Sequence, residues 1–208
     1  MFLPEAFLNS EQSELLDLIH NNPFATLITP AAESLTADHI PLLLSVEGDT
    51  LLLQGHLARP NPLVESLSEG VTGLAIFEGT NHYISPNWYL SKKEHERVVP
   101  TWNYTVVHAR GPITLHDDAD WKLGLVSRLT DKMESFMPVP WSVSDAPDKF
   151  IQQQLRAIVG IEIKIDSMEG KWKLSQNKPL QDRQGVKDGL KEMDNLAADK
   201  MADLIDID

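Results

Sequence analysis

Apolar residues recur at helical spacing in several parts of the chain. Asn9 and Gln12 have the spacing of a capping box, and the apolar stripe that follows predicts a first helix ending before Pro23. A short helix is expected over residues 63–67, because proline is tolerated in a first helical turn. The stretch 158–179 alternates apolar and polar residues and predicts a strand, a turn and a second strand.

Two longer helices are expected after residue 116. Asp118 is a suitable cap for the first, whose apolar residues recur every four positions. Ser144 or Asp145 can cap the second, which Gly160 ends. The residues after Gly185 form an amphipathic tail, and we expect one acidic C-terminal helix over residues 181–208, following a barrel domain with helical additions over residues 1–180.

Short apolar runs bounded by turn residues dominate the first half of the chain. Glu47-Gly48-Asp49 joins two of them into a hairpin, and Gly111-Pro112 interrupts a longer one. Helices do not alternate with these runs, which argues against a doubly wound parallel sheet. The pattern predicts a mainly β protein with peripheral helices, built on a small antiparallel barrel. The strand runs are residues 24–29, 36–46, 50–56, 72–79, 82–89 and 99–116.

The composition narrows the partners and the compartment. The 208 residues carry a formal net charge of −13, which repels nucleic-acid phosphates and argues against direct DNA binding. Cysteine is absent, so there is no disulfide framework or thiolate chemistry. The first residues lack a basic region, and no apolar run is long enough to cross a bilayer. We expect a cytoplasmic protein without membrane contact.

Arg59 is the first candidate for chemistry. It stands at the end of a predicted strand, just before a predicted helix, where free backbone amides favour anions. An arginine at this corner can grip a phosphate through two hydrogen bonds. The alternative is a surface arginine at a turn.

Residues 170–179 are the second candidate, because three lysines fall within one short segment of an acidic chain. Strand alternation places Lys173, Ser175 and Asn177 on one side, and Trp172 and Gln176 on the other. A donor-rich face suits a planar heteroaromatic anion. The alternative is a solvated sheet edge on which lysines prevent aggregation.

Aromatic residues are the third candidate for ligand binding. Sequence motifs for metal binding, nucleotide binding and nucleophilic hydrolysis are absent. The aromatic side chains between residues 82 and 104 can stack on a flat ligand, fill an interface or lie in a core. The seven histidines show no metal-ligand spacing, and there is no P-loop, nucleophile elbow or dinucleotide fingerprint. We therefore expect no metal site.

The segments FATLIT, HIPLLL, GHLARPNP, AIFEGTNHYISPNWY, VPTWNYTVVHARG and GKWKLSQNKP occur in this order. Together they resemble the successive motifs of PaiB-type proteins. These form a branch of the FMN-binding split-barrel superfamily, which also holds the pyridoxamine 5′-phosphate oxidases. The resemblance runs from the first residues to about Pro179.

This resemblance implies a six-stranded antiparallel Greek-key barrel that forms a homodimer, with FMN at the dimer interface. It implies a phosphate-binding role for Arg59, with Asn61 and His39 as further candidates, and places His56 near the flavin. The late strand, which often comes from the neighbouring subunit, implies ring or ribityl contacts, and so does the strand that carries Trp102. The ring candidates are Trp102, Tyr104, Trp172, Lys173, Ser175, Gln176 and Asn177.

The oxidases of the superfamily carry more basic residues at the two phosphate segments, where His39 and Leu44 stand here and Pro60 follows Arg59. Pyridoxine phosphate oxidase activity is therefore not expected. The leading hypothesis is an FMN-binding regulatory or redox-sensing protein linked to negative transcriptional regulation. The alternatives are an FMN-dependent oxidoreductase acting on a small molecule, a haem-binding or haem-degrading split barrel, and a scaffold that has lost its cofactor. The sequence does not decide whether the protein is an enzyme.

Overall fold

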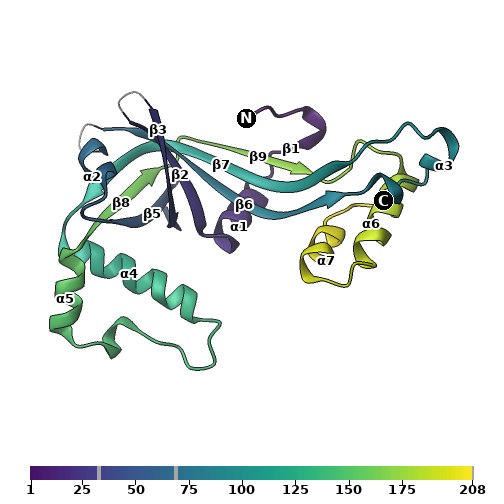
Figure 1. Ribbon diagram of the computed structural model, residues 1–208. Coiled ribbons are helices and arrows are strands. Elements are labelled where there is room, and N and C mark those ends of the chain that lie inside the picture. The colour runs from purple at the N-terminus through teal and green to yellow at the C-terminus, as the bar shows by residue number, and fades with distance from the viewer. Residues whose placement is uncertain (32–33, 68–69, 208) are drawn as a thin grey trace. The chain divides into compact units, whose positions relative to one another are not determined.

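The computed structural model describes residues 1–31, 34–67 and 70–207 (Figure 1). Strands and helices follow one another in the order expected of a β protein with added helices. The strands are β1 (Leu8–Asn9), β2 (Phe24–Ala31), β3 (Ser34–Pro41), β4 (Leu43–Glu47), β5 (Thr50–Ala58), β6 (Thr72–Ile84), β7 (Thr101–His116), β8 (Ile158–Lys164) and β9 (Ser167–Lys173). The α-helices are α1 (Gln12–Asn21), α2 (Pro62–Leu67), α3 (Lys92–His95), α4 (Ala119–Glu134), α5 (Asp148–Arg156), α6 (Leu180–Lys191) and α7 (Leu196–Asp203).

The strands form one sheet in the order β3-β2-β6-β7-β8-β5-β4, and β9 pairs with both β1 and β7. The registered pairs are antiparallel. This confirms the mainly β fold with peripheral helices. Among the described residues the path starts at β3 and stops at β4, so the sheet is not closed into a full barrel, and short strands raise the number above the six expected.

The turn between β4 and β5 was predicted correctly from the sequence, and its geometry shows the reason. Glu47 pairs with Thr50, and Gly48 between them has φ +59°, a left-handed conformation that glycine adopts readily. Further along β5, Leu53 and Leu57 are buried, as are Ile163 and Val159 opposite them on β8. Strand alternation therefore puts an apolar face on one side of these strands and a polar face on the other.

Several local predictions were wrong. The run 36–46 forms two strands, because β3 ends at Pro41 and β4 begins at Leu43. The strand alternation expected to run through residue 177 stops at Lys173, where β9 ends. The runs 72–79 and 82–89 do not form two strands, because β6 continues unbroken from Thr72 to Ile84. Gly111-Pro112 lies inside β7 and does not interrupt it. The helix expected after Ser144 or Asp145 starts later, at Asp148, because a 3-10 turn (Val143–Asp145) takes those residues and Pro147 precedes the helix.

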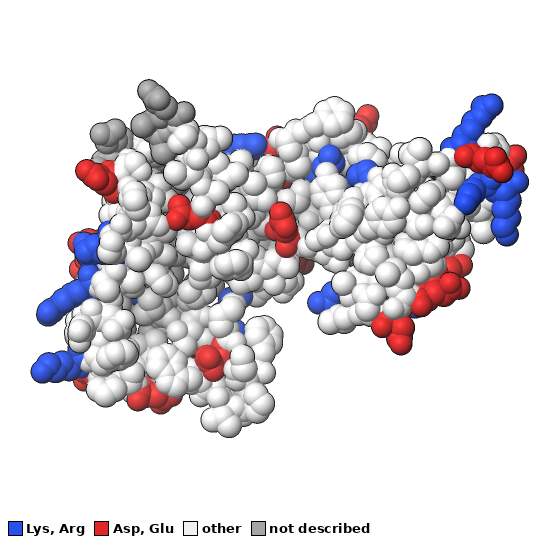
Figure 2. Space-filling view, viewed as in Figure 1, with Lys and Arg blue, Asp and Glu red and all other residues white. Residues whose placement is uncertain are grey.

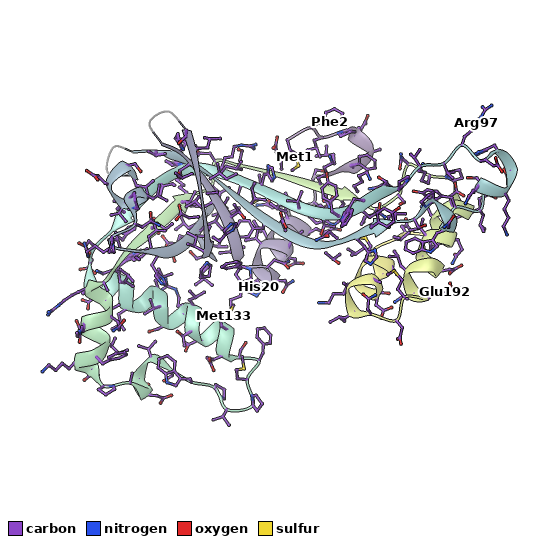
Figure 3. The ribbon with its side chains drawn as sticks, in the orientation of Figure 1. Met1, Phe2, His20, Arg97, Met133 and Glu192 are labelled. Carbon is purple, nitrogen blue, oxygen red and sulfur yellow. The ribbon has the colours of Figure 1, made fainter. Side chains whose placement is uncertain are left out.

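Other local predictions are confirmed. The helix α4 begins where expected, and the Asp118 carboxylate accepts a hydrogen bond from the Trp121 backbone N–H at 2.8 Å. The helix α1 ends at Asn21, before Pro23, as expected, but the predicted capping box is wrong: the helix begins at Gln12, and Asn9 lies in β1, where its side chain accepts from the Glu11 N–H. Lys132, near the end of α4, donates to the His20 carbonyl oxygen at 2.5 Å, and His20 and neighbouring Met133 are labelled in Figure 3.

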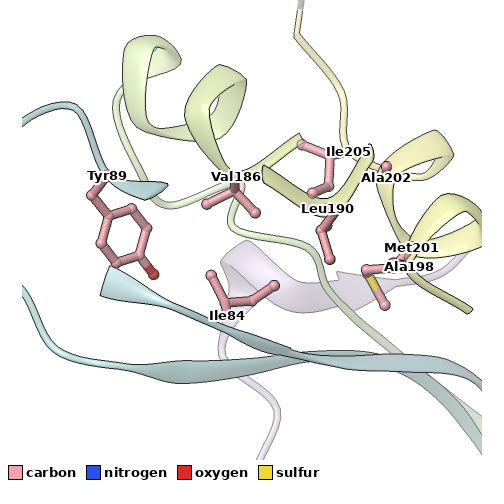
Figure 4. Close-up of a cluster of buried hydrophobic side chains, with 8 residues drawn as sticks. All are labelled: Ile84, Tyr89, Val186, Leu190, Ala198, Met201, Ala202 and Ile205. Carbon is pink, nitrogen blue, oxygen red and sulfur yellow. The ribbon is translucent and has the colours of Figure 1, made fainter. Parts of the chain in front are cut away.

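The chain divides into two compact units, each described here by itself. Unit 1 holds residues 1–18, 78–107 and 169–208, and unit 2 holds residues 19–77 and 108–168. The C-terminal residues form two helices, α6 and α7, instead of the single helix expected. Their apolar side chains pack with Ile84 and Tyr89 in the core of unit 1 (Figure 4). No helix among the described residues is long and apolar enough to cross a membrane.

Candidate functional site

The predicted site residues fall into two sets, one in each unit. Unit 2 holds the four phosphate-side candidates His39, His56, Arg59 and Asn61, and unit 1 holds the seven ring-side candidates. Their assignment to FMN stays a prediction, and the contacts of each side chain show what it is able to do.

Arg59 follows β5 and ties three pieces of unit 2 together. Its Nε donates to the Arg156 carbonyl oxygen at 2.8 Å, and its Nη2 donates to the Ile158 carbonyl oxygen at 3.2 Å. Both terminal nitrogens also donate to the Asp117 carboxylate, with Nη1 at 3.1 Å from Oδ2. The guanidinium thus binds the last carbonyl of α5, the first carbonyl of β8 and a carboxylate, so any external anion competes with Asp117.

A second cation shares the same carboxylate. The Lys122 side chain is only 4% exposed, and its Nζ lies 2.8 Å from Asp117 Oδ1. It also donates to the carbonyl oxygens of Leu155, at 2.8 Å, and Ile158, at 3.3 Å. Hydrogen bonds from Arg59 and then Lys122 lower the pKa of Asp117 to about 2, so this carboxylate stays ionised at every physiological pH.

Asn61 and His39 each form polar contacts with neighbouring side chains. The Asn61 amide donates to the Asp38 carboxylate at 2.7 Å and accepts from the Leu63 N–H at 2.8 Å, which caps the start of α2. His39 Nδ1 lies 3.1 Å from Thr26 Oγ1, and its ring stacks on Phe24. Asp38 places a negative charge beside Asn61, which opposes a phosphate there.

His56 has a different environment. It pairs with Gly160 of β8 in the sheet register and is half-buried. Burial lowers the pKa of its imidazole, so the neutral ring is favoured at neutral pH. Its buried Nδ1 has no hydrogen-bond partner among the residues that the structure describes. A neutral ring suits contact with an uncharged part of a ligand better than with a phosphate.

One aromatic candidate of unit 1 has a ring that is exposed to solvent. The Trp102 side chain is 51% exposed although it lies on a strand. Its indole Nε1 donates to Asn81 Oδ1 at 3.1 Å, and Tyr83 packs edge-on against it at 6.0 Å between ring centroids. These two contacts fix the orientation of the Trp102 ring, so it can serve as a preformed stacking surface.

Three lysines of unit 1 lie in β9 or shortly after it. Lys173 Nζ donates to Thr101 Oγ1 at 2.5 Å and to the Trp102 carbonyl oxygen at 2.6 Å. Lys171 Nζ lies 5.5 Å from the Tyr104 ring centroid and donates to the carbonyl oxygen of Phe2, which is labelled in Figure 3. Lys178 Nζ lies 5.0 Å from the Tyr89 ring centroid. We call Lys171, Lys173 and Lys178 the lysine cluster.

The lysine cluster lacks counter-charges. Among the described residues no carboxylate forms an ion pair with any of the three. Burial, and then repulsion from Lys171 and Lys178, lowers the pKa of Lys173. In a chain with 31 acidic and 18 basic residues, three cations that repel one another form a site suited to an anion.

The remaining ring-side candidates differ in whether their side chains are buried and hydrogen-bonded within the protein or exposed to a ligand. Ser175 and Asn103 are both buried and bond to each other, with Asn103 Nδ2 donating to Ser175 Oγ at 3.0 Å. Gln176 bonds locally to the backbone of Leu174 and Trp172. Trp172 is half-buried, whereas the Asn177 side chain is exposed and makes no hydrogen bond among the described residues. Ser175 and Gln176 therefore shape the segment, and Asn177 is open to a ligand.

Sequence reasoning missed Asp117, Lys122 and Arg156, which surround Arg59 in unit 2. For Lys122 a signal existed, because it stands three and seven residues before Leu125 and Leu129 on the apolar stripe of α4. A lysine on a buried helix face needs a partner, which Asp117 supplies. For Arg156 no local pattern exists, since only the folded chain brings the end of α5 to Arg59.

Two solved structures share this fold. The FAD and haem binding protein from Mycobacterium smegmatis matches with a TM-score of 0.59 at 18% identity, over 80% of this chain and 73% of that one. The flavocytochrome Anf3 from Azotobacter vinelandii matches with a TM-score of 0.55 at 14% identity, over 80% of this chain and 69% of that one. The fold is that of the FMN-binding split-barrel proteins.

The chain belongs to the family described as "Putative FMN-binding domain", whose model matches residues 1–167. It is 29% identical to the Protease synthase and sporulation protein PAI 2 of Bacillus subtilis, over 99% of this chain and 97% of that protein. It is 30% identical to an uncharacterised protein of Emericella nidulans, over 99% of this chain and 96% of that one. The expected membership of the PaiB family is confirmed.

Proposed function

We propose that this protein binds FMN and acts as a redox-responsive regulator. The observation that carries the proposal is the lysine cluster, which forms no ion pair among the described residues and whose Lys173 donates to the Trp102 carbonyl oxygen. Its chemistry fits a planar anionic cofactor, and the chain belongs to a family of FMN-binding domains. Positive charge beside a flavin ring stabilises the reduced, anionic form, so a cationic receptor on the ring side favours FMN in an acidic protein.

In this proposal, Trp102 and Lys173 have distinct tasks in binding the flavin. The Trp102 ring, oriented by Asn81 and Tyr83, offers a flat apolar face. Lys173, held by Thr101 and the backbone of Trp102, keeps an ammonium group in place where negative charge accumulates. A bound flavin supplies hydride and single-electron transfer, and nearby positive charge tunes its potential.

We extend the proposal to the quaternary structure. A homodimer with FMN at its interface allows the ring-side residues to come from the neighbouring subunit. Because the chain carries a net charge of −13, regulation through a ligand or a protein partner is favoured over direct contact with DNA. The Bacillus subtilis relative is named a protease synthase and sporulation protein, which supports a regulatory role, and we place this role in the cytoplasm.

Titration of the purified protein with FMN, followed by flavin fluorescence, tests the proposal. The matched variants are Lys173→Gln and Lys93→Gln, since Lys93 is an exposed lysine of α3 in the same unit. We expect the first to weaken FMN binding roughly tenfold or more, the loss of a charge-assisted contact, and the second to leave it unchanged. Equal affinities in both variants would remove the lysine cluster from the site.

An FMN-dependent oxidoreductase is the second candidate, favoured by the exposure of Trp102, which leaves one ring face open to a substrate. Bleaching of the flavin band by NADH or NADPH, with recovery in air, supports this candidate. The same titration performed with haem tests the haem-binding alternative through a shift of the haem absorbance band.

A further inference from the structure

Unit 2 contains a cavity beside α4 and α5 that none of the candidate flavin residues lines. The chain leaves α4, turns back through the 3-10 turn (Val143–Asp145) and enters α5 (Figure 1). These three pieces border a cavity with a volume of about 390 Å³. Small-molecule sites in proteins have volumes of roughly 300–1,000 Å³, so this cavity is large enough to hold a small ligand.

One wall of the cavity is aliphatic. Its side chains are Leu123, Val143 and Ile151, which come from α4, the 3-10 turn and α5 in that order. All three side chains are half-buried, so each keeps part of its apolar surface accessible. Removing such surface from water is favourable, and the wall therefore suits the apolar body of a ligand.

The other wall is polar, and most of its side chains have no partner in the protein. Ser127, Asp148 and Gln152 supply a hydroxyl, a carboxylate and an amide. None of these three side chains forms a hydrogen bond or an ion pair within the described part of the chain. Ser144 also lines the cavity, but its hydroxyl oxygen already lies 2.6 Å from that of Ser142. Three polar groups are thus left for a ligand.

The charge of the cavity is negative. Asp148 gives the lining a formal charge of −1, and no described basic residue lines it. The neighbouring cations do not neutralise Asp148, because Arg128 donates to the Gln54 side chain at 2.9 Å and Lys149 is adjacent on the helix, where successive residues do not face each other. An unpaired carboxylate beside an apolar wall selects a cation.

The surface that leads to the cavity does not oppose a cation either. Residues 135–144, between α4 and the 3-10 turn and into that turn, contain no charged side chain. Figure 2 shows this part of unit 2 as largely uncharged surface with separate acidic side chains. A positively charged ligand therefore meets no basic side chain on this segment.

We propose that the cavity binds a small organic amine, with the ammonium group on Asp148 and the apolar body on the aliphatic wall. Asp148 and Gln152 are four residues apart on α5, so their side chains share one face of the helix. With the Ser127 hydroxyl they offer three kinds of acceptor oxygen, and a primary ammonium group has three N–H donors. The inference does not rest on flavin binding.

The test is an NMR titration of the isotopically labelled full chain with two probes, phenethylamine and its neutral analogue 2-phenylethanol, at pH 7 and fixed ionic strength. We expect the wild type to bind the amine roughly tenfold more tightly than the alcohol, the gain from one charge-assisted contact. Asp148→Asn should lower amine affinity to that of the alcohol and leave alcohol affinity unchanged. Asp148 is exposed and unbonded, so this variant is expected to fold.

Asp120→Asn is the matched control, because Asp120 is an exposed acidic residue in the first turn of α4 that does not line the cavity. It removes the same charge from the chain and should keep the preference for the amine. Ile151→Ala shortens the aliphatic wall and should weaken both probes several-fold.

Three results would each overturn the inference: equal affinity of the wild type for the two probes, binding of neither probe, or an equal loss of amine affinity in Asp148→Asn and Asp120→Asn. A parallel FMN titration separates this inference from the proposed function. Asp148→Asn should bind FMN as the wild type does. A wild type that binds phenethylamine in this way but does not bind FMN would leave the amine site standing while the proposed function fails.

Discussion

Arg59 and Asp117 form a two-point ion pair that joins the end of β5 to the segment before α4. The same guanidinium donates to the carbonyl oxygens of Arg156, at the end of α5, and of Ile158, at the start of β8, so one side chain links several elements of unit 2. The predicted phosphate-binding arginine therefore also has a structural task. An anion that binds Arg59 has to replace Asp117 without releasing α5.

Asp117→Asn is expected to change stability in a pH-dependent way. The folded protein holds the pKa of Asp117 at about 2, below its ordinary value of 3.8. A depressed pKa contributes stability that is fully present above the ordinary value and is lost as the pH falls through the folded value. Urea denaturation should show the variant to be less stable than the wild type at pH 7. The gap should narrow between pH 4 and pH 2, and a gap of constant size across that range would contradict the ion pair.

Ser175→Ala is expected to destabilise the protein by about 1–3 kcal/mol, because it leaves the buried Asn103 amide without its partner. Ser175 also has φ +67°, so Ser175→Gly should lose less stability than Ser175→Ala, by roughly 1 kcal/mol. Asn177→Ala, two residues away and exposed, is the control and should change stability by less than about 0.5 kcal/mol. Thermal denaturation measures all three, and equal melting temperatures for the Ala variants at 175 and 177 would refute the buried bond.

Two helical glycines should respond to alanine in opposite directions. A Cβ at Gly185 of α6 would lie 2.0 Å from the Trp88 carbonyl oxygen, so Gly185→Ala has to push α6 away and should cost about 1–3 kcal/mol. At Gly124 of α4 the nearest atom is the flexible end of Arg128, at 3.3 Å. Gly124→Ala should therefore stabilise the protein by roughly 0.5–1 kcal/mol through helix propensity. Stability changes of the same sign in both variants would show that α6 does not pack on Trp88 this closely.

FMN binding should depend on the charge of Lys173. Burial and two neighbouring lysines lower its pKa, so Lys173 loses its proton at a lower pH than an exposed lysine does. FMN affinity should fall as the pH rises through that lowered pKa. Lys173→Arg should keep its affinity to higher pH, because guanidinium does not deprotonate in this range. Parallel pH profiles for the two proteins would exclude Lys173 as the titrating contact.

The sequence pattern was sufficient wherever local chemistry decides structure. The Gly48 turn and the Asp118 cap were predicted because each depends on residues a few positions apart. The unbroken run of β6 was not predicted, because pairing with neighbouring strands outweighs the local turn signals around residue 80. The start of α5 was misplaced because capping residues also favour 3-10 turns.

The candidate site was only partly readable from sequence. Lysine density in an acidic chain led to Lys173, and strand alternation suggested that Ser175 and Asn177 would face a ligand with it. The structure instead commits Ser175 to a buried bond with Asn103, a residue 72 positions away. Arg156 reaches Arg59 only through the packing of α5 on its neighbours, which no local pattern records. Contacts of long sequence separation thus decide which polar side chains are free.

The visible absorbance of the purified protein, recorded after incubation with FMN and removal of unbound cofactor, shows directly whether the protein holds a flavin. We predict retained flavin absorbance at about one FMN per subunit in the wild type, and its loss when Lys171 and Lys173 are both changed to Gln. A wild-type protein that stays colourless after incubation with excess FMN would contradict the central claim.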